Sequence, residues 1–100
     1  MKYIPESVEE AFFERHFEYG DDEETVLSNA SKAFSLMESS YKKVTALAEK
    51  VEDGECYDTS EAILQFQTLA LSREYLEGFL KDMKEEVAKE YREKIKNLLV

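Results

Sequence analysis

The sequence predicts an all-α fold in which a short N-terminal helix packs on a long antiparallel helical hairpin that resembles a coiled coil. Apolar residues recur at spacings of three and four through most of the chain, which is the period of an amphipathic helix. The 100 residues include only three glycines and one proline, too few for a turn-rich β fold. We expect one domain, with an acidic helix within residues 1–20 and the hairpin in residues 21–100.

The first helix is predicted over residues of about 5–19. Pro5 suits a first helical turn, where its missing N–H costs nothing, and acidic residues follow it there. Gly20 is typical of the residue that comes just after a helix. The connection to the next helix is short, so we expect the first helix to fold back along the first half of the second.

The second helix is predicted over residues of about 22–52. Its apolar residues alternate steps of three and four, the heptad spacing that packs one helix on another. Asp21 or Asp22 can cap its first turn, and Asp53 followed by Gly54 is expected to end it. The predicted seam consists of Leu27, Ala30, Phe34, Met37, Tyr41, Val44, Ala48 and Val51.

The third helix is predicted over residues of about 59–98, as one uninterrupted element, because no helix breaker follows until the C-terminus. Asp58, Thr59 or Ser60 can cap it. A connection of about six residues makes it the antiparallel neighbour of the second helix. Its predicted seam consists of Ala62, Phe66, Leu69, Leu76, Leu80, Met83, Val87, Tyr91, Ile95 and Leu98.

The third helix carries a second apolar stripe that a simple hairpin does not need. This stripe lies nearly opposite the first and includes Leu64, Leu71, Tyr75 and Phe79. The first helix is expected to be too short and too far away to cover it. We therefore interpret the stripe as an oligomer or second interface, with a homodimer as the expected assembly. The alternative is that the first helix covers the stripe within the same chain.

Negative charge is concentrated near the N-terminus. The chain has a net charge of −10, and residues 1–25 carry nine acidic side chains against Lys2 and Arg15. Phe13 and Phe17 fall on the far side of the first helix from its main apolar stripe. Acidic residues surround these two rings: Glu6, Glu9, Glu10 and Glu14.

These six residues are the predicted partner-binding face, because charge can steer and aromatic rings can anchor a contact with a basic, pocketed surface. The alternative is that Phe13 and Phe17 wedge into the groove between the other helices. The strongly negative charge argues against direct binding to nucleic acid or to anionic membranes.

The sequence predicts no catalytic residues, no cofactor and no metal site. His16 is the only histidine, and the Glu-x-x-His pairs of a helical di-iron site are absent. Cys56 stands among acidic residues, which disfavour a reactive thiolate. No apolar stretch is long enough for a signal peptide or a membrane span, so we expect a cytoplasmic protein.

We therefore predict a protein that is not an enzyme and acts by contact with another protein. The leading hypothesis is a small acidic inhibitor or adaptor, of the kind that viruses and mobile elements encode, which mimics nucleic acid and occupies a basic nucleic-acid-binding surface of its partner. The alternative is a structural or chaperone-like hairpin that oligomerises or shields a partner helix. Salt separates the two, because exposed charges are screened over about 10 Å at 0.1 M salt.

Overall fold

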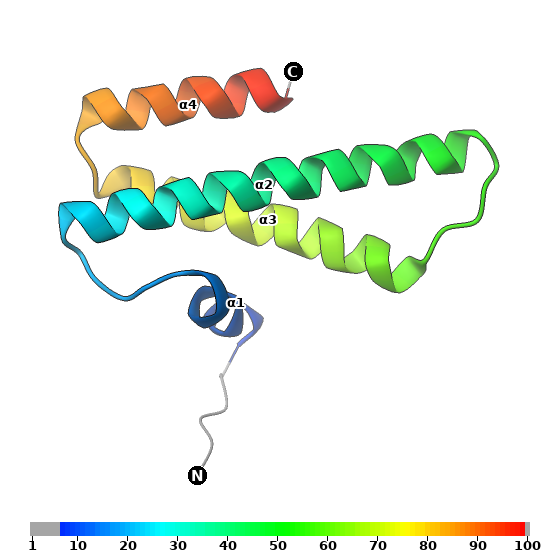
Figure 1. Cartoon of the computed structure of the whole chain (residues 1–100), viewed down its shortest axis with the longest axis horizontal. Helices are drawn as coiled ribbons and strands as arrows, with labels where there is room; N and C mark the ends of the chain where they lie inside the picture. The colour runs from blue at the N-terminus through cyan, green and yellow to red at the C-terminus, as the bar shows by residue number, and fades with distance from the viewer. Residues whose placement is uncertain (1–6, 100) are drawn as a thin grey trace, which may run out of the picture.

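The computed structural model describes residues 7–99, and this part of the chain forms helices and connections without any strand (Figure 1). The all-α helical hairpin fold is confirmed. The start of the predicted first helix, including Pro5 and Glu6, lies outside the described residues. The helices are α1 (Val8–His16), α2 (Glu23–Glu52), α3 (Thr59–Lys81) and α4 (Glu85–Leu99).

The ends of the α2–α3 hairpin follow the capping residues in the sequence. Asp22 caps α2 by accepting the N–H of Thr25 (3.0 Å), and Asp58 caps α3 by accepting the N–H of Ser60 (2.8 Å). At the end of α2, Gly54 has a φ of +74°, the left-handed conformation in which glycine terminates helices. The predicted bounds of α2 and the start of α3 are therefore confirmed.

The face of α2 that packs on α3 agrees with the predicted seam at Ala30 and Met37, which are fully buried, and differs from it at other positions. Ala33 and Ser40 are buried at positions next to Phe34 and Tyr41, which the prediction places in the seam. The buried hydroxyl of Ser40 is satisfied because it donates to a backbone C=O one turn earlier (2.7 Å). The larger Phe34 ring turns toward α4, where its centroid lies 6.4 Å from that of Tyr91.

On α3, too, some buried positions hold small or polar side chains where the prediction placed larger ones. Gln65 and Ser72 are buried in the seam, whereas Phe66 is 57% exposed. The Gln65 amide donates to the Glu61 carboxylate (2.8 Å), so its nitrogen has a hydrogen-bond partner although the residue is buried. The prediction that Phe66 belongs to the seam is wrong, because the neighbouring residue Gln65 occupies the buried position and turns Phe66 toward solvent.

The predicted third helix is wrong in its length. Helix α3 ends at Lys81, and α4 begins at Glu85 after a three-residue turn. Helix α4 then folds back beside the hairpin, antiparallel to α3 and parallel to α2 (Figure 1). This placement half-buries apolar side chains that an extended helix would leave uncovered: Met83, Val87, Tyr91, Ile95 and Leu98.

Helix α1 is shorter than predicted and lies elsewhere. It ends at His16, because Phe17 leaves the helix with extended backbone and enters the core at 6% exposure. Gly20, the expected terminator, instead shapes the connection to α2 with a φ of +150°. The helix packs against the second stripe of α3, so the prediction that it follows the first half of α2 is wrong.

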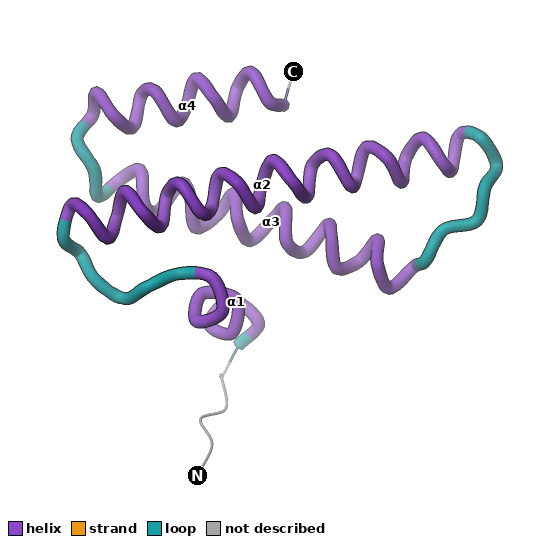
Figure 2. The backbone as a smooth tube through the Cα atoms, in the orientation of Figure 1, coloured by secondary structure: helices purple, strands orange, loops and turns teal. Residues whose placement is uncertain are grey.

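The hairpin therefore has two unlike halves. We call residues 23–41 and 69–81 the base, and residues 42–68 the tip. Helix α1 lies on one side of the base and α4 on the other, in a flat arrangement with extents of 48 × 43 × 14 Å (Figure 1). The end of the hairpin with the connection between α2 and α3 extends beyond both covering helices (Figure 2).

Candidate functional site

The second stripe of α3 is divided between the two halves of the hairpin. Its base members are Leu71, Tyr75 and Phe79. Leu71 is half-buried and lines a hollow together with residues of α1. Tyr75 and Phe79 contact aromatic rings of the α1 segment, with the Tyr75 centroid 5.5 Å from that of Phe13 and the Phe79 centroid 5.1 Å from that of Phe17. Coverage within the same chain, the alternative considered above, thus occurs in the base. In the tip, Leu64 is 50% exposed.

Two polar contacts attach the α1 segment to the hairpin. Asn29, buried in α2, accepts the backbone N–H of Glu18 (3.0 Å) and donates to the C=O of the same residue (2.8 Å). The Tyr75 hydroxyl donates to the backbone C=O of Glu9 (2.7 Å). Because backbone groups are the partners, these bonds specify where the segment lies and do not depend on its side chains.

The predicted partner-binding face is rearranged in the structure. Phe17 is buried and Phe13 is half-buried against the core cluster, so the wedge alternative describes where these rings lie. Glu9 and Glu14 are exposed and Glu10 is half-buried, whereas Glu6 lies outside the described residues. The acidic side chains are thus displayed at the surface without the two exposed rings that sequence reasoning placed among them.

The exposed acidic surface continues through the connection into α2. Glu18, Asp21, Asp22, Glu23 and Glu24 are all exposed. The Asp22 carboxylate has its pKa lowered, chiefly because it accepts hydrogen bonds from the Thr25 side chain and N–H. Beside it, Glu23 approaches Lys84 with 3.8 Å between Oε1 and Nζ. We call residues 9–24 the acidic segment.

Large apolar side chains gather at the tip instead. Five of them are 47–57% exposed. In contrast, the base side chain Leu76 is fully buried. The buried residues of the tip are Ala62 and Gln65, and these larger side chains point away from the helix–helix contact. We call this set the tip surface: Val51, Tyr57, Ile63, Leu64 and Phe66.

Two hollows adjoin the tip on the side of α1. One, of about 150 Å³, lies where α1 meets the tip and is bounded by apolar side chains of both, among them Phe12 and Leu64. The other, of about 230 Å³, has Ala46 and Leu47 in its lining together with Lys43 and Lys50. The apolar surface that receives α1 therefore continues along the hairpin beyond the end of α1.

Sequence reasoning missed the tip surface because it assigned Phe66 and Val51 to the seam. The signal that could have revealed it is the alternative seam of small and polar residues, which follows the same heptad spacing one position away. Ala33, Ser40 and Ser72 belong to that seam. A seam search restricted to large apolar residues does not detect it.

His16 and Cys56, whose side chains can take part in acid–base or thiol chemistry, lie in different parts of the molecule. His16 is half-buried beside the Phe12 ring, 4.6 Å between centroids, and burial together with the nearby Arg15 charge lowers the pKa of its imidazole. Cys56 is an exposed free thiol in the connection between α2 and α3. Within residues 7–99, no three His, Cys, Asp or Glu side chains are grouped to hold a metal ion.

Comparisons with known proteins add no functional information. No protein-family model, curated protein or solved structure matches this chain. In the described part of the chain, no helix has the length and apolar character needed to cross a membrane.

Proposed function

We propose that this protein is a non-enzymatic interaction module whose tip surface binds an amphipathic helix of another protein. The observation that supports this proposal is the concentration of exposed apolar side chains at the tip. Several large apolar side chains exposed in one part of a molecule are typical of protein-binding regions. The proposal includes a cytoplasmic location, where the exposed Cys56 stays a thiol.

The kind of partner is inferred from what the hairpin already binds. In the base, the same two helices accept α1 on one side and α4 on the other, both short and amphipathic. Beyond the ends of α1 and α4, the tip continues these two sides without a covering helix. Lys43 and Lys50 flank the hollow beside Leu47, so a partner helix with carboxylates next to its apolar stripe fits that side.

The test uses a displayed library of amphipathic helices with the length of α4, selected on the wild-type protein. We expect the selected helices to bind Leu64→Glu, on the α1 side of the tip, or Ile63→Glu/Phe66→Glu, on its α4 side, at least about tenfold more weakly than the wild type, because each variant places charge in the apolar contact on its own side. The matched control is Ser31→Glu/Ser35→Glu, which adds the same charge at exposed positions of the base. Binding that neither Leu64→Glu nor Ile63→Glu/Phe66→Glu weakens more than the control does, or the absence of any selected helix, contradicts the proposal.

A second candidate is the acidic inhibitor or adaptor that occupies a basic, nucleic-acid-binding surface. The exposed carboxylates of the acidic segment favour it. Burial of Phe17 removes one of the two proposed anchors, so this contact would depend on charge. Screening against basic peptides from DNA- and RNA-binding proteins tests it.

The acidic-inhibitor proposal expects binding at low salt that is lost at high salt and on adding a DNA duplex, because charge alone carries the contact. Glu9→Gln/Glu14→Gln should weaken it, whereas Glu49→Gln/Glu52→Gln, equally exposed but at the tip, should not. Binding that resists salt excludes this mode. Binding that is lost equally with both pairs of substitutions shows only a general attraction between opposite charges.

A further inference from the structure

The turn between α3 and α4 contains nothing that forces a helix to end. Its residues are Asp82, Met83 and Lys84, with no proline or glycine among them, and no residue other than glycine has a positive φ in the described chain. Asp82 has a φ of −94° and a ψ of 2°, and its N–H donates to the C=O of Phe79 (3.1 Å). Helical hydrogen bonding resumes in α4, where Ala88 donates its N–H to the C=O of Lys84 (3.0 Å).

The apolar stripe keeps its phase across this turn. At 100° per residue, the core residues of α3 and the apolar face of α4 fall on one side of a single imaginary helix. A straight helix through the turn would therefore carry one continuous stripe: Leu76, Leu80, Met83, Val87, Tyr91, Ile95 and Leu98. Both the turn and the straight helix are compatible with these residues.

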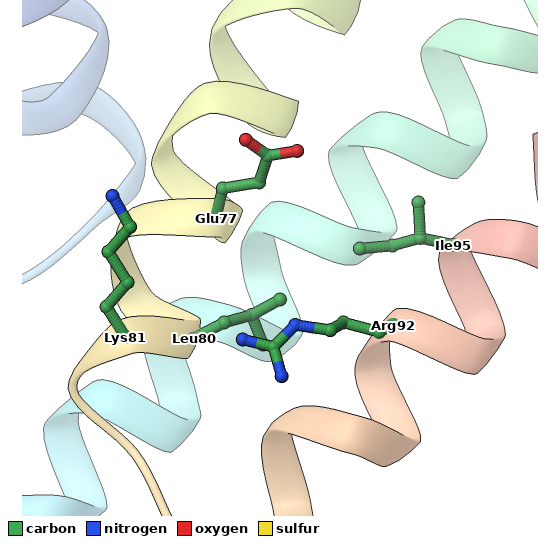
Figure 3. A pocket seen from close by; sticks show the side chains of 5 residues that line it. All are labelled: Glu77, Leu80, Lys81, Arg92 and Ile95. Carbon is green, nitrogen blue, oxygen red and sulfur yellow. The ribbon is translucent and has the colours of Figure 1, made fainter. Parts of the chain in front are cut away.

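The attachment of α4 to the base is limited. Ala88 is its only fully buried residue. The short ion pair of Arg92, with 2.9 Å between Nη1 and Glu85 Oε1, joins α4 to itself. A hollow of about 290 Å³ also separates α3 from α4: Glu77, Leu80 and Lys81 line it from α3, and Arg92 and Ile95 from α4 (Figure 3).

A straight α3–α4 helix cannot exist in a lone molecule without exposing the apolar face of α4 and the groove that α4 occupies. A second copy that opens in the same way offers that groove, with the same Phe34 ring to meet Tyr91. Exchange of an identical element preserves the contacts between α4 and the base and alters the turn, which makes it a low-cost route to dimers.

We propose that α4 is exchanged between two copies of this chain, which gives a homodimer in which residues 59–99 form one continuous helix in each copy. This inference goes beyond the proposed function and uses a different surface, because the exchanged helix lies on the base and leaves the tip surface free. The partner is a second copy, since only it supplies the same groove.

The first test blocks the straight helix without harming the turn. Glu85 is the first residue of α4, a position where proline is well tolerated, whereas the same residue would lie in the interior of the straight helix, which proline breaks. Glu85→Ala is the matched control, because it removes the same carboxylate and keeps the N–H. Asp82→Ala, which improves helix propensity at the turn, is expected to favour the exchange.

Light scattering over a wide concentration range measures the outcome. We expect a wild-type dimer at high concentration, retained in Glu85→Ala, more abundant in Asp82→Ala, and at least about a hundredfold weaker in Glu85→Pro. A protein that stays monomeric at all concentrations in both the wild type and Asp82→Ala overturns the proposal. A dimer that survives Glu85→Pro overturns it as well.

The second test asks which chain supplies α4. In a Cys56→Ser background, Phe34→Cys/Tyr91→Cys is oxidised in the isolated dimer fraction and run on a denaturing gel. Exchanged helices give covalent dimers on the gel. A dimer formed through the tip surface gives disulfides within each chain and runs as a monomer, and this result overturns the proposed exchange. Ile63→Glu/Phe66→Glu should leave an exchanged dimer intact, so failure of the exchange and failure of the proposed function are distinguishable.

Discussion

The base and the tip are built from the same two helices, yet they differ in how much they bury. In the base, α1 and α4 cover the two sides of the hairpin and Leu76 is fully buried; the tip extends beyond both of these helices and Phe66 is 57% exposed. Two helices alone have only one shared face, so large side chains outside that face stay in solvent. Burial in this protein is therefore determined by the two short helices more than by the hairpin.

The polar contacts show the same contrast. The base holds Asn29, whose buried amide has partners for both its oxygen and its nitrogen on the α1 segment. At the tip, the Gln65 amide bonds only to Glu61, one turn earlier on its own helix. Contacts between distant segments stabilise the base, whereas contacts within a single helix predominate at the tip.

The largest expected effect compares truncations in the two halves. Leu76→Ala should lower the free energy of unfolding by about 2–5 kcal/mol, because it leaves a cavity in the core. Phe66→Ala should change it by about 0.5 kcal/mol or less, because the ring is mostly in solvent. Urea denaturation followed by circular dichroism measures both. A similar loss in the two variants would show that the tip is packed by something else.

The next effect concerns the attachment of α1. Asn29→Ala removes both bonds to the Glu18 backbone and should lower the free energy of unfolding by about 2 kcal/mol. Hydrogen exchange should then accelerate over residues 8–19 more than over the tip. Asn29→Asp is the matched control, because it keeps the acceptor for the N–H and loses the donor. Its free energy of unfolding should lie between those of the wild type and Asn29→Ala only if both bonds contribute.

A smaller effect is expected from the Tyr75 hydroxyl. Tyr75→Phe keeps the aromatic contacts with α1 and removes the bond to the Glu9 C=O, which should cost about 1 kcal/mol. In the wild type, burial and the neighbouring carboxylates of Glu9 and Glu74 raise the pKa of the Tyr75 phenol. Ultraviolet titration should therefore lose one phenol that ionises above the ordinary pKa, and an unchanged titration would contradict this assignment.

The smallest effect is the pH dependence of His16. Burial lowers the pKa of its imidazole below the ordinary value of 6.5, so the unfolded chain takes up a proton at a higher pH than the folded one. The free energy of unfolding should thus decline from about pH 7.5 to about pH 5.5, where carboxylates remain mostly ionised. His16→Gln should flatten this decline, and an equal slope in the variant would assign it to other groups.

The sequence by itself determined the elements that depend on local interactions. Asp22 and Asp58 cap their helices, and Gly54 ends α2, because each acts on backbone groups within a few residues of itself. The apolar periodicity likewise determined that the chain is all-helical and folds as a hairpin. The concentration of negative charge at residues 9–24 also follows directly from the sequence.

Only the tertiary structure decided which residues fill the seam, where the long third helix bends and what α1 covers. Each of these outcomes depends on packing energies between segments that are far apart in the chain. Ala33 and Ser72 enter the seam because the helices approach closely, and Phe17 leaves its helix because the aromatic cluster buries it. The turn at residues 82–84 forms because it returns α4 to the base, a gain that no property of those three residues encodes.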